Sequence, residues 1–431
     1  MLPCFRSLVA IGRHTATCCS RAVAHCAPQK SLNLLLPTTT AVWHGELQID
    51  HAGYQKKLAE ITKRLKEHLK GQKWPKLTHL EVEGRRFKLP VRLDDLDPSF
   101  IAELEEDTDD KHLAGFFDGD GCVSPQSCLS GCILQVAQSA KNNIILFRYL
   151  IRHGGCISLQ RAGCGSASPS VCWRASGQTA WHAASVLQMN YLVKKEQLRI
   201  ATSWPACKEK RNACKTRLVL LKNIAPDLPS SQALSWTYLA GFFDAEGCIR
   251  LSPTCNTFRL EIGQRHATIL KFIHSFLLGQ LPRHSSLKLY CRKTSSLLHC
   301  ARRATITAIL NNLLAHRLEG KRPEALLALN MADSSHSKLR QDLALGKGRQ
   351  SYFTRLDDHG CTRARDINNK AKKLRYAVGK GLVVADKLQL DLTRAKLQHE
   401  VLNSQSQIQK LRSFIAFVRN MVASPSPQHQ E

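Results

Sequence analysis

The middle of the chain alternates between two hydrophobic patterns, which predict two kinds of element. Residues 142–152 and 268–278 carry apolar side chains three or four positions apart, which predicts helices with one buried face. Residues 287–292 alternate apolar and polar side chains, which is typical of a strand with one exposed face. Because helices and short strands alternate, the pattern predicts a mixed fold in which both classes share one core.

One phrase occurs twice in this region. The sequence LAGFFDGDGCV begins at Leu113, and LAGFFDAEGCI begins at Leu239. The same order of elements follows each copy, so two pseudo-symmetric halves are expected instead of a repeat array. Expected strands are 133–138, 157–161 and 170–175 in the first half, and 258–264, 286–292 and 297–302 in the second. The expected later helices are 142–152 and 179–189 in the first half, and 268–278 and 305–314 in the second. The predicted class is α+β, with two αββαββα halves.

The rest of the chain divides by composition. Residues 1–45 contain no Asp or Glu, which is typical of a transit peptide to a mitochondrion or chloroplast. Residues 46–110 form a charged, partly helical extension with an amphipathic helix over 54–69. The halves span 111–203 and 232–333, and a linker containing prolines and basic residues, 204–231, joins them. Residues 334–431 are basic and helical and end in a disordered tail. A heptad-like seam over 382–419 predicts a long helix that packs on the core or on a coiled-coil partner, or else a solvated basic helix.

Charge indicates a polyanionic partner. The chain has 62 Lys and Arg against 34 Asp and Glu, a formal charge of +28, which favours nucleic acid over other ligands. No uncharged apolar run is long enough for a membrane span. The 17 cysteines include no Cys-x-x-Cys pair, so we interpret most of them as core residues in a reducing compartment.

The repeated phrase suggests a specific chemistry. Small residues four apart, Gly115 and Gly119 in the first copy and Gly241 and Ala245 in the second, let two helices pack closely. If the helices pair in parallel, Asp120 and Glu246 emerge together at one end. Two adjacent carboxylates repel each other and favour a shared cation, for which Mg²⁺ bound partly by substrate phosphates is suited. Such a metal can assist phosphodiester hydrolysis.

Both phrases resemble the LAGLIDADG motif of homing endonucleases, in the single-chain form with two motifs. The resemblance covers about residues 111 to 333. It implies that Asp120 and Glu246 bind catalytic metal, while Asp118 and Asp244 have a more structural role. It also implies that Gln138 and Gln264 lie near the metal, and that Lys194 and Lys321 complete the site near the start of each final helix. Lys195 and Arg322 are alternatives for that basic residue.

The resemblance further implies a saddle whose sheets read duplex DNA in the major groove. Candidate contacts are polar or basic residues of the expected strands: Gln160, Arg161, Arg174, Arg259, Lys288, Arg292 and Arg302. Their alternative interpretation is as solvated strand residues or phosphate contacts. The extensions 46–110 and 334–431 are not explained by the family.

Three functions follow from these features. The first is a site-specific, Mg²⁺-dependent double-strand DNA endonuclease with a monomeric core, acting in an organelle. The second is a relative converted to an RNA maturase, splicing factor or organellar RNA-binding protein, with intron RNA as its partner; the basic C-terminal segment fits this reading. The third is an inactive relative in which the phrase serves only helix packing.

Overall fold

The computed structural model describes residues 74–332, with short gaps at 127, 129, 141–142, 165–167, 191–192, 227, 229–233, 252–256, 283–285 and 292–294, and residues 358–399. A few isolated helical positions are also described. Several predictions lie outside these residues: the transit peptide over 1–45, most of the helix over 54–69, Arg292, the end of the linker, and most of the seam beyond 399. No described helix is long and apolar enough to cross a membrane.

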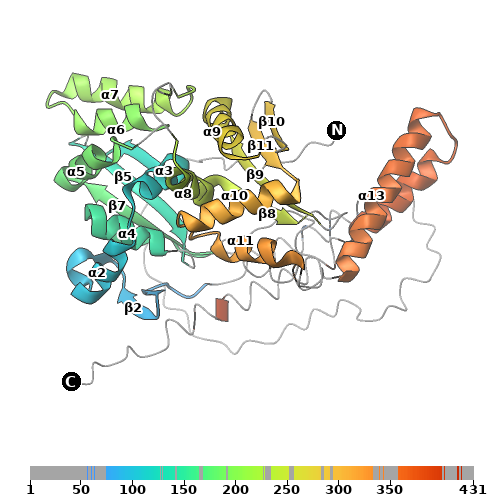
Figure 1. Cartoon of the computed structure of the whole chain (residues 1–431), viewed down its shortest axis with the longest axis horizontal. Helices are drawn as coiled ribbons and strands as arrows, with labels where there is room; N and C mark the ends of the chain where they lie inside the picture. Colours follow the sequence, from blue (N-terminus) through green and yellow to red (C-terminus); the bar gives the residue numbers. More distant parts are fainter. Residues whose placement is uncertain are drawn as a thin grey trace. The chain divides into compact units, whose positions relative to one another are not determined.

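The first half begins with its copy of the phrase, which forms a helix. Its elements follow the expected order: α3 (Asp110–Asp120), β4 (Gly121–Pro125), β5 (Cys132–Ser139), α4 (Ile144–His153), β6 (Cys156–Arg161), β7 (Ser170–Ser176) and α5 (Gly177–Leu187). The strands are antiparallel, in the spatial order β6-β7-β5-β4. Helices α4 and α5 pack against this sheet (Figure 1). Along most of β5, buried side chains alternate with half-buried ones.

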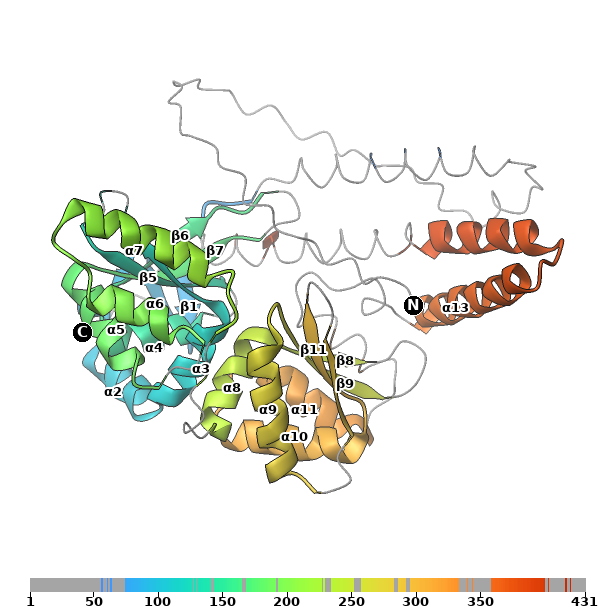
Figure 2. The same ribbon diagram turned by 90° about the horizontal axis from the view of Figure 1, so that it is seen from above.

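The second half repeats the same order. Its elements are α8 (Trp236–Glu246), β8 (Gly247–Leu251), β9 (Phe258–Gln264), α9 (Ala267–Gln280), β10 (Leu287–Cys291), β11 (Ser296–Cys300) and α10 (Arg303–Ala315). Its four strands lie in the order β10-β11-β9-β8, and α9 and α10 pack on the sheet (Figure 2). The α+β class and the αββαββα order of both halves are therefore confirmed.

The described part of the N-terminal extension, from residue 74 onward, is built into the first half. It forms β1 (His79–Val82), β2 (Arg85–Lys88), β3 (Val91–Arg92), a short 3-10 helix (Leu93–Asp95) and α2 (Pro98–Glu106). Strand β3 pairs with β6, which gives the first sheet a fifth strand. Phe87 and Phe100 pack on Phe147 of α4, with ring centroids 5.0 and 5.9 Å away. The sequence predicted a partly helical extension here and missed the strands.

One further helix in each half extends the repeated order, and a third helix stands outside it. Helix α6 (Lys195–Thr202) comes after α5, and α11 (Arg322–Leu329) comes after α10. Helix α7 (Lys208–Leu221) lies within the segment expected as a linker and packs on α6 and β4. In the C-terminal extension, α13 (Asp358–Gly379) and further helical residues over 385–399 are described.

Candidate active site

Helices α3 and α8 form the closest contact between the two halves (Figure 1). A Cβ added at Gly115 would collide with the carbonyl oxygen of Tyr238, and one added at Gly241 would collide with the carbonyl oxygen of His112. Main chain therefore packs on main chain at both positions. Glycine within a helix is destabilising by about 0.5–1 kcal/mol relative to alanine, and this close approach is what requires it.

The two halves differ one helical turn later. Gly119 of α3 faces Ala245 of α8, and a Cβ at Gly119 would collide with the Cβ of Ala245. One small side chain thus fills the space between the helices where two would not fit. This is the helix pair that the spacing of small residues predicted.

Asp120 and Glu246 are the last residues of α3 and α8. Gln138 Nε2 donates a hydrogen bond to Asp120 Oδ2 at 2.8 Å, and Gln264 hydrogen-bonds the Glu246 carboxyl. Asp120 opens onto the surface, but protein atoms surround most of its carboxyl group. Burial raises its pKa, against the hydrogen bond from Gln138 and the charges of Lys321 and Lys194.

The pKa of Glu246 depends on the acid of the other half, Asp120. Burial raises the pKa of the Glu246 carboxyl, and the neighbouring charge of Asp120 raises it further. The hydrogen bond from Gln264 and the charges of Lys194 and Lys321 act in the opposite direction. The structure therefore brings the two acids, both glutamines and both lysines into one electrostatic cluster at the junction of the halves.

Lys194 and Lys321 are the N-cap residues of α6 and α11. They therefore precede the helices that follow α5 and α10, one helix later than the sequence suggested. Lys194 Nζ donates to the carbonyl oxygens of Phe117 at 2.7 Å and Gly119 at 3.2 Å, and also to that of Asp118. Their rivals Lys195 and Arg322 are exposed at the first position of the same helices.

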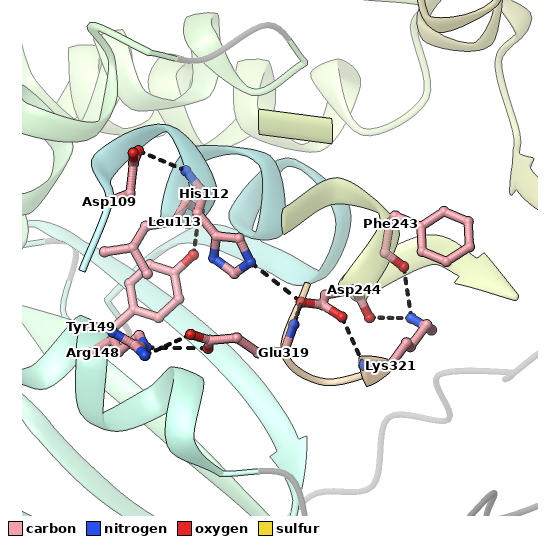
Figure 3. Close-up of polar contacts among 9 residues, drawn as sticks. All are labelled: Asp109, His112, Leu113, Arg148, Tyr149, Phe243, Asp244, Glu319 and Lys321. Atoms are coloured by element: carbon pink, nitrogen blue, oxygen red, sulfur yellow. Dashed lines mark hydrogen bonds and ion pairs between the residues drawn. The ribbon is translucent and has the colours of Figure 1, made fainter. Parts of the chain in front are cut away.

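Lys321 makes the matching contacts in the second half. Its Nζ donates to the carbonyl oxygen of Phe243 at 2.8 Å and to that of Asp244 (Figure 3). Each ammonium group thus binds carbonyls at the negative end of a motif helix. Burial lowers the pKa of both lysines, while the neighbouring acids, Asp120 among them, act to raise it. Both cations are held beside the carboxylates by the end of the helix itself.

Asp118 and Asp244 each fasten a loop to a motif helix. The Asp118 carboxylate accepts hydrogen bonds from the backbone N–H of Val193 at 2.9 Å and of Lys194 at 2.7 Å. Asp244 accepts from the backbone N–H of Glu319 at 2.8 Å and of Lys321 at 2.9 Å (Figure 3). These two buried acids hold the lysines in place, in agreement with a structural role.

A residue of the opposite half completes each of these clamps. Tyr238 of α8 donates to Asp118 Oδ2 at 2.6 Å, and His112 Nε2 of α3 lies 3.3 Å from Asp244 Oδ2. Tyr238 and His112 both precede the leucine of their phrase. A polar ring at the same position of both copies was a signal of this contact in the sequence, and sequence reasoning missed it.

A buried ion pair also joins the halves. Arg148 of α4 reaches Glu319 of the second half, with its NH2 group 2.6 Å from Glu319 Oε1 (Figure 3). Its NH1 group donates to the Leu104 carbonyl at 3.1 Å and to Thr108 Oγ1 at 3.3 Å, in the N-terminal extension. Arg148 thus ties together three segments that are far apart in sequence. No local pattern could have revealed this contact.

The predicted DNA contacts fall into three groups. Gln160, Arg161 and Arg174 are exposed on β6 and β7, and the first two line an open hollow of about 630 Å³ that also contains Asp120 and Gln138. In the second half, Lys288 is exposed on β10 and Arg259 is half-buried on β9. Arg302 was expected in a strand, but β11 ends at Cys300 and Arg302 is the N-cap residue of α10.

The donors at the junction fit a hard divalent cation. Two carboxylates from different chain segments converge where burial disfavours their charge, and carboxylate oxygens are the ligands that Mg²⁺ prefers. Among the described residues, no group of three or more His, Cys, Asp or Glu side chains is arranged to hold a metal. An ion here would therefore draw its remaining ligands from water, backbone and substrate phosphate, as Mg²⁺ does in phosphoryl chemistry.

Comparisons with known proteins gave one kind of match. No protein-family model and no curated protein matches the chain. Among solved structures, it is similar to I-SmaMI bound to uncleaveable DNA with a TTGT central four, at 16% identity and a TM-score of 0.41, covering 57% of this chain and 99% of that one. It is also similar to DNA-bound I-AabMI and I-CpaMI, each at 14% identity and a TM-score of 0.40, covering 55% of this chain and 98% of theirs. These matches are LAGLIDADG homing endonucleases, the family that the two phrases resemble.

Proposed function

We propose that the chain is a site-specific endonuclease that cuts both strands of duplex DNA with a divalent metal ion, Mg²⁺, bound by Asp120 and Glu246. The observation that carries this proposal is that one carboxylate from each half, at the end of its motif helix, converges on the same place. Each carboxylate is hydrogen-bonded by a glutamine and lies near a lysine. A two-fold arrangement of acids matches a substrate whose two strands are themselves related by a two-fold axis.

The chain's own groups have separable tasks. A bound metal ion would supply an activated water and stabilise the charge on the leaving oxygen. Gln138 orients the Asp120 carboxylate and Gln264 orients that of Glu246. Lys194 and Lys321 add positive charge beside the place where the phosphate must sit, which stabilises negative charge developing there. Asp118 and Asp244 keep both lysines in position.

DNA binding is supported by the exposed sheet residues and the net charge. Gln160 and Arg161 line the same hollow as Asp120, so a duplex contacting β6 would also lie next to that acid. Polar side chains on a sheet face can read base edges in the major groove. The formal charge of +28 supplies the binding energy that comes from phosphate contacts.

The test is a selection with the full chain. Duplexes bound from a randomised library in Ca²⁺ are transferred to Mg²⁺ and scored for double-strand cuts, with Asp120→Asn beside the wild type. Exposed Glu106→Gln, on α2 and outside the cluster, is the charge-matched control. Cutting at one sequence that Asp120→Asn abolishes and Glu106→Gln retains would support the proposal. Site-specific cutting by an Asp120→Asn, Glu246→Gln double variant would refute the site.

An RNA role remains the second candidate because of the C-terminal extension. Helix α13 carries six Lys and Arg over 363–375 against one Asp. Basic arms of this kind suit intron RNA as well as DNA. If the selection recovers no duplex, and deletion of residues 336–431 abolishes intron RNA binding, the maturase function replaces the nuclease.

We also propose an organellar location, which is supported only by the acid-free composition of residues 1–45. A fluorescent fusion of these residues that stays in the cytosol would contradict it.

A further inference from the structure

Helix α7 is the most basic described helix that packs on the two-half core. Over residues 208–222 it carries six Lys and Arg and one Glu. It lies on the outer side of α6 and also contacts β4, the strand that directly follows Asp120 (Figure 2). Neither the repeated phrase nor the site described above makes use of this charge.

Five of the six cations form two separate rows, and the sixth, Arg211, is half-buried and donates a hydrogen bond to the Pro205 carbonyl at 2.9 Å. Lys208, Lys215 and Lys222 are seven residues apart, so they lie on the same face of the helix. Successive lysines are separated by about 10 Å along the helix axis. Lys210 and Arg217 form a second line on the opposite side of buried Leu218. All five side chains are exposed. We call the first line the lysine row and the second the outer pair.

The lysine row ends beside β4, the strand that follows Asp120. Lys222 Nζ lies 3.6 Å from the sulfur of Cys122, two residues beyond Asp120. The next residue, Asn223, accepts a hydrogen bond at 2.7 Å from Arg265, which directly follows Gln264. The C-terminal end of α7 therefore contacts both halves beside the two acids. The outer pair has no third cation at this end, because the residue seven positions after Arg217 is Ile224.

The row's charges are not neutralised by the protein. Among the described residues, none of the three lysines forms an ion pair with an acid, and the one acid of α7, Glu209, accepts a hydrogen bond from the Cys207 thiol. Exposed ammonium groups at regular spacing are suited to phosphates, where each contact releases condensed counterions. Since Lys222 contacts Cys122, two residues beyond Asp120, a duplex bound at the acids would lie close to this lysine.

We propose that the lysine row is a phosphate-binding arm that extends the DNA interface from the catalytic cluster along α7, with Lys222 closest to the cleaved phosphates. This proposal rests on the proposed nuclease function and adds a contact that the repeat does not contain. After α11 of the second half and before α13, the described residues are the 3-10 helix Asn330–Ala332 and the isolated helical positions Leu339 and Leu343, none of which is basic.

The test compares two variants of equal charge. The full-length Lys208→Gln, Lys215→Gln variant removes two charges of the lysine row, and Lys210→Gln, Arg217→Gln removes the outer pair. Binding to a random-sequence 40-base-pair duplex is measured by fluorescence anisotropy in Ca²⁺, over a range of salt. We expect the first variant to reduce the slope of log affinity against log salt by about 1.8, since each phosphate contact contributes about 0.9. The outer-pair variant should keep the wild-type slope.

Thermal unfolding shows whether either double variant has lost its fold. A third variant, Lys222→Gln, tests the end of the row next to Asp120. With the target selected above, Lys222→Gln should slow Mg²⁺-dependent cutting at saturating protein by tenfold or more, on the order of the loss of one electrostatic contact. Equal slopes for the two double variants, with unchanged cutting by Lys222→Gln, would overturn the arm while leaving the nuclease intact. A wild-type chain that binds no duplex would overturn both.

Discussion

The two halves of the molecule repeat each other closely at their junction and differ most at their outer edges. At the junction, the Asp118 and Asp244 clamps, the two lysines and the two glutamines correspond one to one. At the edge, the first sheet has a fifth strand and an aromatic cluster, whereas the second has four strands. The repeat is thus retained where both halves must meet, and lost where each half has its own neighbours.

The largest expected effect comes from breaking the tie between the halves. Arg148→Met should lower the free energy of unfolding by about 3–5 kcal/mol, because it leaves the mostly buried Glu319 carboxylate without its partner. Chemical denaturation would measure this. The Arg148→Met, Glu319→Met variant should recover most of the loss, and equal destabilisation in both variants would show that the ion pair is not the cause.

The Gly119–Ala245 contact allows a swap between the halves. Gly119→Ala should be destabilising by about 1–3 kcal/mol, because its methyl group collides with that of Ala245. Adding Ala245→Gly should restore stability, since the same space then holds one methyl group. Gly115→Ala offers no such rescue, because its collision is with the Tyr238 backbone. Unfolding curves of all three variants test this, and failure of the swap would refute the helix contact.

The two clamps differ in the residue that the other half supplies. Tyr238→Phe removes the hydroxyl that donates to Asp118 at 2.6 Å and should lower stability by about 1–2 kcal/mol. The Lys194 backbone bond to Asp118 is retained, so DNA cutting should fall less than in Asp118→Asn. Equal cutting rates for Tyr238→Phe and Asp118→Asn would contradict this separation of roles.

The smallest effect has the opposite sign. Asp120→Asn should raise the stability of the metal-free protein at neutral pH, by less than about 1 kcal/mol because solvent partly screens the group. Burial raises the pKa of Asp120, so its ionisation opposes folding as pH rises through that pKa. The gain should therefore disappear as pH falls below the ordinary value of 3.8. Calorimetry across this range would test it, and a variant less stable than the wild type at pH 7 would contradict it.

Sequence reasoning succeeded where a local pattern carried the information. The repeated phrase marked α3, α8 and the acids, and polar–apolar alternation marked β9 at 258–264 as the structure has it. It failed for β2, where Arg85, Arg86 and Lys88 surround one apolar residue and the strand depends on its partner. It also treated α7 as linker, because prolines on either side and a high charge obscured a helix with one buried leucine.

The positions of the site residues show the same limit. Both lysines were identified, but not that their side chains bind the carbonyls at the ends of the motif helices. That contact depends on a loop held by Asp118 or Asp244, some 75 residues away along the chain. Tertiary structure, and not any local spacing, sets the charge environment of the cluster.

The unequal pair Gly119 and Ala245 also restricts how this molecule could be assembled from separate pieces. Two copies of the second half, joined through α8, would place one alanine methyl group on another where only one fits. Two copies of the first half would leave that space empty. The best-packed arrangement is one of each, so neither half could form an equally well-packed symmetric dimer. Covalent linkage in a single chain guarantees that the two unlike surfaces meet in equal numbers.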